Sequence, residues 1–127
     1  MMEDNSQEPV LGKPDSEPST QIDTFPTEGS VELINFRSSE LTAVCPVTNQ
    51  PDFYIINISY SPKSKCIETK SLKLFLRTFE GTGIFAEHLA PEIANHLARS
   101  VEVPVSVVLE QQIRGGIVTT VTATSAI

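Results

Sequence analysis

The sequence predicts an α+β domain in which two helices cover one face of a small antiparallel sheet. Apolar residues recur at period two in residues 53–60 and 101–111, as in strands that are buried on one face. Between these segments, Leu72, Phe75, Leu76 and Phe79 recur at the spacing of one buried helical stripe. Strands that flank a block of helices, instead of alternating with them, indicate the α+β class.

Six elements are expected in chain order. A short β-prone run at residues 31–37 predicts the first strand, and a loop of turn-forming residues separates it from the second at 53–60. Helices are expected at about 69–79 and 85–99, with Gly81-Thr82-Gly83 ending the first. Strands at 101–111 and 117–124 complete the sheet. Its open edges predict a homo-oligomer that extends the sheets between subunits.

The charge of the chain is unevenly distributed. The chain has 127 residues, enough for one domain, and a net charge of −7, yet residues 1–30 hold seven acids and one base. Residues 1–28 also hold four of the nine prolines and no apolar period, which predicts a disordered acidic tail before a domain at 29–127. The nearly neutral remainder argues against direct binding of nucleic acid.

The apolar segments and the cysteines bear on location. No apolar run approaches the roughly 20 residues that span a bilayer, and the N-terminus lacks a signal-peptide pattern. We therefore expect a cytoplasmic protein with no membrane partner, in which Cys45 and Cys66 are reduced. Two cysteines and two histidines without the spacing of metal ligands predict no metal site.

Cys45 is the first candidate for chemistry. A free cysteine is most often a small buried hydrophobe, but one in a polar loop with a proton-transfer partner can be a nucleophile. Asp52 lies seven residues further on, so a loop that returns to its own strand could bring the two side chains together. The residues alone leave both interpretations open.

Charged residues at the starts of the two helices are further candidates. Lys70 and Lys73 are either part of a solvated helical face or a cationic patch for phosphate groups at the positive end of a helix. Glu87 is favoured at a helix start by the helix dipole, and could also hold the N–H edge of a purine-like ring.

Five motifs in one order give these candidates a common context. Together they resemble the NADPH-dependent 7-cyano-7-deazaguanine reductases of queuosine biosynthesis, a tRNA modification pathway, over residues 31–124. The motifs are Cys45-Pro46-Val47-Thr48-Asn49-Gln50-Pro51-Asp52-Phe53, Ile58-Ser59-Tyr60-Ser61-Pro62, Glu68-Thr69-Lys70-Ser71-Leu72-Lys73-Leu74-Phe75, Gly83-Ile84-Phe85-Ala86-Glu87 and Arg114-Gly115-Gly116.

The resemblance implies a tunnelling fold (T-fold), whose subunits join strands into β-barrels with active sites at subunit interfaces. It implies that Cys45 attacks the nitrile carbon to form a covalent thioimidate and that Asp52 passes a proton to the nitrile nitrogen. Hydride from NADPH then completes the reduction to the amine. By the same match, the substrate is contacted by Glu87, Glu68 and Ser71, and NADPH by Lys70, Ser71, Lys73 and Arg114.

One departure from the family pattern keeps an impaired protein in view as an alternative, and a second alternative stands independently of it. The family has histidine before the anchoring glutamate, whereas this chain has Ala86 there and His88 just after Glu87. Positions 86 and 88 are separated by about 200° around a helix, so His88 does not simply replace the missing ring. One alternative is a catalytically impaired T-fold protein that binds a deazapurine. The other is a same-fold amidinotransferase that acts on the nitrile in tRNA.

Overall fold

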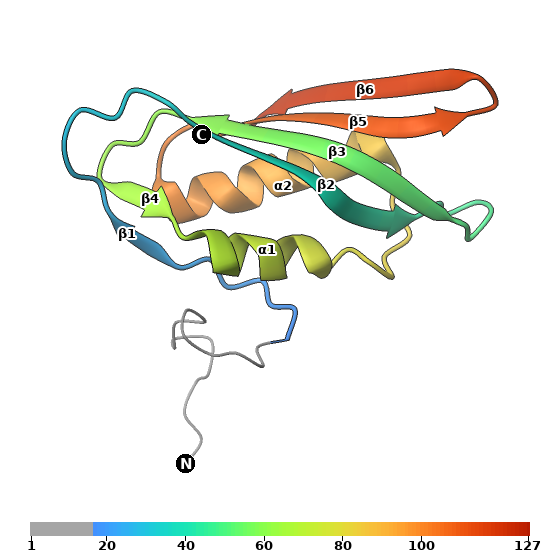
Figure 1. Ribbon diagram of the computed structural model, residues 1–127, viewed down its shortest axis with the longest axis horizontal. Coiled ribbons are helices and arrows are strands. Elements are labelled where there is room, and N and C mark those ends of the chain that lie inside the picture. The colour runs from blue at the N-terminus through green and yellow to red at the C-terminus, as the bar shows by residue number, and fades with distance from the viewer. Residues whose placement is uncertain (1–16) are drawn as a thin grey trace, which may run out of the picture.

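Two helices cover one face of a four-stranded antiparallel sheet in the computed structural model, which describes residues 17–127 (Figure 1). The strand order in the sheet is β2-β3-β5-β6. The elements are β2 (Ile34–Val44), β3 (Pro51–Tyr60), α1 (Thr69–Arg77), α2 (Ala86–Val101), β5 (Ser106–Arg114) and β6 (Ile117–Thr124). This order confirms the predicted α+β T-fold, with both helices between the second and third strands of the sheet. Within the described residues, neither helix is long and apolar enough to cross a membrane.

The core forms where the apolar sides of the sheet and the helices meet. Side chains along β3 alternate between buried and more exposed positions, and Ile56 and Ile58 are almost completely buried. Leu89, Ile93 and Leu97 of α2 pack into the same core with no exposed surface. The two periodicities of the sequence therefore identified the buried faces correctly. The strand order leaves β2 and β6 as the two edges of the sheet.

A second, two-stranded sheet holds the beginning of the described chain. Strand β1 (Thr24–Pro26) pairs antiparallel with β4 (Lys65–Ile67) just before α1. The Asp23 amide donates to Ser71 Oγ at 2.9 Å, and the Glu68 amide donates to the Asp23 carbonyl at 2.9 Å. Residues 24–27 of the expected tail are therefore paired, because they gain partners at residues 64–67, about 40 positions away, that composition does not reveal. Residues 1–16 of that expected tail lie outside the described part of the chain.

Two predicted strand boundaries also need correction. Strand β2 continues through residues 38–44, which were assigned to a loop, because a bulge between Ser38 and Leu41 interrupts the alternation. Residues 101–105 do not belong to β5. Val101 instead ends α2, and Glu102 ends the helix in the left-handed region at φ 63°. The alternating valines at these positions are as compatible with a helix end and a connecting segment as with a strand.

Candidate active site

The hairpin between β2 and β3 brings Cys45 and Asp52 together. In the strand register Val44 faces Pro51 and Ala43 faces Asp52, so the chain reverses within residues 45–50. The Cys45 amide donates to the Gln50 carbonyl and the Asn49 amide donates to the Cys45 carbonyl, both at 2.8 Å. Asn49 has φ 62°, a left-handed conformation that asparagine tolerates better than most residues. The returning loop expected from the sequence is therefore present.

The same turn favours the thiolate form of Cys45. Its pKa is lowered from the usual thiol value, first by a hydrogen bond from the Thr48 side chain and then by the Thr48 and Val47 amides. Partial burial and the Asp52 charge act in the opposite direction and are smaller. A thiol in a polar turn whose pKa is lowered by neighbouring donors is suited to nucleophilic attack rather than to packing.

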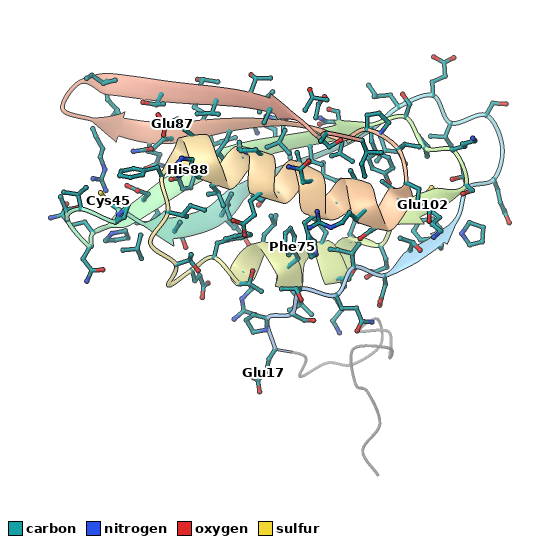
Figure 2. All side chains as sticks on the ribbon, turned by 180° about the vertical axis from the view of Figure 1, so that it is seen from behind. Glu17, Cys45, Phe75, Glu87, His88 and Glu102 are labelled. Atoms are coloured by element: carbon teal, nitrogen blue, oxygen red, sulfur yellow. The ribbon has the colours of Figure 1, made fainter. Side chains whose placement is uncertain are left out.

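The segment before α2 is hydrogen-bonded to Val44, the residue that precedes Cys45. The Val44 amide donates to the Thr82 carbonyl at 2.9 Å, and the Ile84 amide donates to the Val44 carbonyl at 3.0 Å. These bonds form a short parallel bridge between Val44 and Gly83. They place the first turn of α2 beside the hairpin, so Cys45, Glu87 and His88 lie at the same end of the molecule (Figure 2).

Ala86 and His88 point in different directions from that first turn. Ala86 is buried, at 3% exposed, whereas His88 is exposed and its ring meets the Phe85 ring edge-on at 6.2 Å. The helix is regular from Ala86 onwards, although Pro91 lies inside it. The separation expected from helical geometry is therefore observed, and the His88 ring does not occupy the place of a side chain at position 86.

Asp52 is buried and paired with a cation. Its carboxylate Oδ1 lies 2.5 Å from Arg114 Nη2, an ion pair by distance that lacks hydrogen-bond alignment. The same Arg114 nitrogen donates to the Pro51 carbonyl at 2.9 Å. Arg114 was expected to contact NADPH. In the structure it contacts Asp52 instead, and its cofactor contact stays a prediction.

Tyr54 is a member of this group that sequence reasoning missed. It lies two residues after Asp52 on the same buried face of β3, and its pKa is raised to about 12. Burial is the main cause, and the charges of Asp52, Glu87 and Cys45 raise it further while Arg114 lowers it. The only signal in the sequence was a hydroxyl-bearing side chain within a stripe of apolar core residues.

Glu68 and Ser71 form the start of α1 rather than part of this group. The two Glu68 carboxylate oxygens accept hydrogen bonds from the Ser71 amide at 2.7 Å and the Lys70 amide at 2.8 Å, which makes Glu68 the helix cap. Ser71 Oγ donates to the Glu68 carbonyl at 2.9 Å. Within one chain both side chains have structural partners, and their contact with substrate stays a prediction.

A groove of about 830 Å³ runs between α1 and β2. Its polar lining contains four bases, the predicted Lys70 and Lys73 together with Arg37 and Arg77, and two acids, Glu40 and Glu80. An excess of cationic side chains along a groove suits a ligand with several phosphate groups. Arg37 lies at the end of the strand predicted at 31–37, but the sequence could not assign it to this groove because the lining depends on how α1 packs across β2. Among the described residues no cluster of ligating side chains could hold a metal ion.

Comparison with known proteins places this chain in a family. A sequence model described as QueF-like protein matches residues 51–126. This chain belongs to the QueF-like protein family. The matched range includes Asp52, Glu87 and Arg114, and Cys45 lies six residues before it.

The chain is also similar to curated proteins named NADPH-dependent 7-cyano-7-deazaguanine reductase. The protein from Frankia casuarinae is 41% identical over 108 residues, which cover 84% of this chain and 86% of that protein. The protein from Syntrophus aciditrophicus is 36% identical over 124 residues, which cover 95% and 88%. The predicted resemblance is confirmed over most of both proteins.

A solved structure supports the fold. The archaeosine synthase QueF-Like in the apo form superposes with a TM-score of 0.72 and 21% identity, and covers 78% of this chain and 98% of that one. At this identity the likeness shows the fold alone.

Proposed function

We propose that this protein reduces the nitrile of 7-cyano-7-deazaguanine to 7-aminomethyl-7-deazaguanine with NADPH, in queuosine biosynthesis. The observation that carries the proposal is that a thiolate-favouring Cys45, the buried Asp52 and the exposed Glu87 lie at one end of the sheet. The reductase names of two relatives, 41% and 36% identical to this chain, support the reaction.

Covalent attack by Cys45 makes the nitrile carbon reactive. A nitrile is a weak electrophile towards hydride. In the proposed step the Cys45 proton passes to Asp52, the sulfur bonds to the nitrile carbon, and one π bond of the nitrile breaks. Asp52 then gives its proton to the nitrogen, so a neutral thioimidate forms with no proton gained or lost. Glu87 accepts hydrogen bonds from the N–H edge of the deazaguanine ring and so orients the nitrile towards Cys45.

The groove between α1 and β2 fits the charged part of NADPH. Lys70, Lys73 and Arg37 would neutralise its phosphate groups, and Arg77 adds a further cation although it lies 3.9 Å from Glu80. When bound, NADPH would supply two hydrides in all; together with the proton already taken from Cys45 and one further proton, these would convert the nitrile into the amine and free Cys45 as the thiolate. The chain's own task at the groove is to bind and orient this polyanion.

We further propose that the active site is completed by a second copy of the chain. Glu68 and Ser71 stand at the start of α1, next to β4, whereas Cys45 lies at the other end of the molecule (Figures 1 and 2). If all three contact one substrate, they must come from neighbouring subunits. The free edges of β2 and β6, and exposed Phe53, Ile113 and Ile117, provide surface for such contacts.

The substrate is proposed to be the free base, and the compartment the cytoplasm. A nucleophilic thiol must stay reduced, and the cytosol keeps Cys45 and Cys66 in that state. Residues 31–127 carry nine acids and eight bases, a balance that does not supply the broad basic face that a tRNA requires. This observation favours the reductase over the amidinotransferase that acts on tRNA.

Two measurements test the proposal. Mixing the protein with the nitrile should add the substrate mass to the intact protein, and Cys45→Ala should abolish the adduct while Cys66→Ala keeps it. NADPH oxidation that depends on the nitrile then separates a reductase from an amidinotransferase. A wild-type protein that forms an adduct without oxidising NADPH would fit the impaired, deazapurine-binding alternative, for which Ala86 is the reason. Absence of any adduct would exclude the mechanism.

A further inference from the structure

The Tyr54 hydroxyl is buried without a partner. The residue is 1% exposed, and within the described part of the chain its hydroxyl has no hydrogen-bond partner. A buried hydroxyl that is left unpaired destabilises the folded protein relative to a phenylalanine of the same shape. A native core rarely keeps such a group without a use for it.

The groups around the Tyr54 hydroxyl indicate which function it serves. Asp52 and Tyr54 point to the same face of β3, and the structure has only two buried side-chain oxygens without aligned hydrogen bonds among the described residues, Asp52 Oδ1 and Tyr54 OH. Asp52 is the first of the charges that act on the Tyr54 phenol. The other charges that act on the phenol are those of Glu87 on α2, Arg114 on β5 and Cys45 in the hairpin turn.

We infer that Tyr54 is a positioning residue, whose hydroxyl donates a hydrogen bond to one oxygen of Asp52 while the other oxygen carries the proton. The inference rests on the proposed function. Asp52 must leave its ion pair with Arg114 when it takes up the Cys45 proton, since a neutral carboxyl no longer needs the cation. A phenol that stays protonated at neutral pH then holds the free carboxyl oxygen and aims the acid towards the nitrile nitrogen.

Direct contact of Tyr54 with substrate is less compatible with its burial. The hydroxyl has no accessible surface, whereas Asp52 is 5% exposed. Tyr54 therefore acts through Asp52 and is not itself a catalytic residue.

Tyr54→Phe tests this inference, with Tyr60→Phe as the matched control. Tyr60 lies on the same face of the same strand, but its hydroxyl oxygen accepts a hydrogen bond from the Ile67 amide at 2.7 Å. Tyr54→Phe should leave the melting temperature unchanged or raise it, and should slow adduct formation about 2- to 10-fold, the loss of one hydrogen bond between neutral groups. Tyr60→Phe should lower the melting temperature and leave the rate of adduct formation unchanged.

A double-mutant cycle with Asp52→Asn tests whether Tyr54 affects the rate of adduct formation through Asp52. If Tyr54 acts through Asp52, then Tyr54→Phe causes no further slowing in the Asp52→Asn background. Equal slowing in both backgrounds would mean direct contact with substrate and overturn the positioning role. A wild-type rate in Tyr54→Phe would overturn the inference while leaving the proposed function intact. A wild-type protein that forms no adduct would overturn both.

Discussion

Glu68 offers the sharpest test of how this fold is held together. Its carboxylate caps α1 by accepting the Lys70 and Ser71 amides, and it is only 9% exposed. Replacing a good cap by alanine costs about 0.5–2 kcal/mol, and burial of the freed Ser71 amide places this site at the upper end, about 2 kcal/mol. Since 1 kcal/mol corresponds to roughly 4 °C for a domain near 100 residues, Glu68→Ala should lower the melting temperature by about 8 °C.

The assay is urea unfolding of Glu68→Ala beside two controls. Glu68→Gln keeps an oxygen that can accept the Ser71 amide, so it should lose roughly half as much stability. Glu80→Ala removes an exposed carboxylate whose nearest cation, Arg77, is 3.9 Å away, and should change stability by about 0.5 kcal/mol or less. If Glu68→Ala lost no more stability than Glu80→Ala, the capping argument would fail.

The same variants also separate capping from substrate binding. Glu68→Gln keeps most of the cap, so a folded Glu68→Gln protein with a raised KM for the nitrile would support the predicted substrate contact. An unchanged KM would leave Glu68 with a structural role alone.

Three further predictions concern the chemistry. Thr48→Val should raise the pKa of Cys45 by removing its main hydrogen bond, so iodoacetamide should alkylate Cys45 more slowly near neutral pH, and this difference should vanish at a pH above the thiol pKa of both proteins. Ala86→His should raise turnover if the family imidazole contributes; an unchanged rate would mean that another group has replaced it. Arg37→Ser should raise the KM for NADPH several-fold without slowing adduct formation, because Arg37 lines the groove and not the hairpin turn. Slower adduct formation in Arg37→Ser would contradict the assignment of Arg37 to NADPH binding alone.

Local pattern was sufficient for most of the fold. The β3 alternation and the α1 stripe survive in the structure because each element buries one face against the same core. The wrong strand boundaries lie where the local sequence pattern does not reflect the pairing that the segment makes in the fold. In strand β2 a bulge interrupts the alternation, so the second half of the strand was not recognised. Strand β1 forms because it pairs with β4, a distant segment. The valines at 101–105 alternate as in a strand, but they lie in the end of α2 and the segment that follows it.

The arrangement of the hairpin that carries Cys45 and Asp52 was predictable in part for a similar reason. Cys45 and Asp52 are joined by one tight turn, so their closeness follows from seven residues of sequence. The attachment of α2 beside Val44 and the partner of Arg114 follow from contacts between distant segments, and no local pattern encodes them.

The sequence by itself determined the α+β class, the buried faces and the pair formed by Cys45 and Asp52, because these depend on periodicity and on short turns. Only the tertiary structure decided that Arg114 pairs with Asp52, that Glu68 and Ser71 lie away from Cys45, and that the Tyr54 hydroxyl is buried beside the acid. Those outcomes depend on which strands become neighbours and how the helices lie across them, and such long-range placements are fixed by the packing of the whole chain.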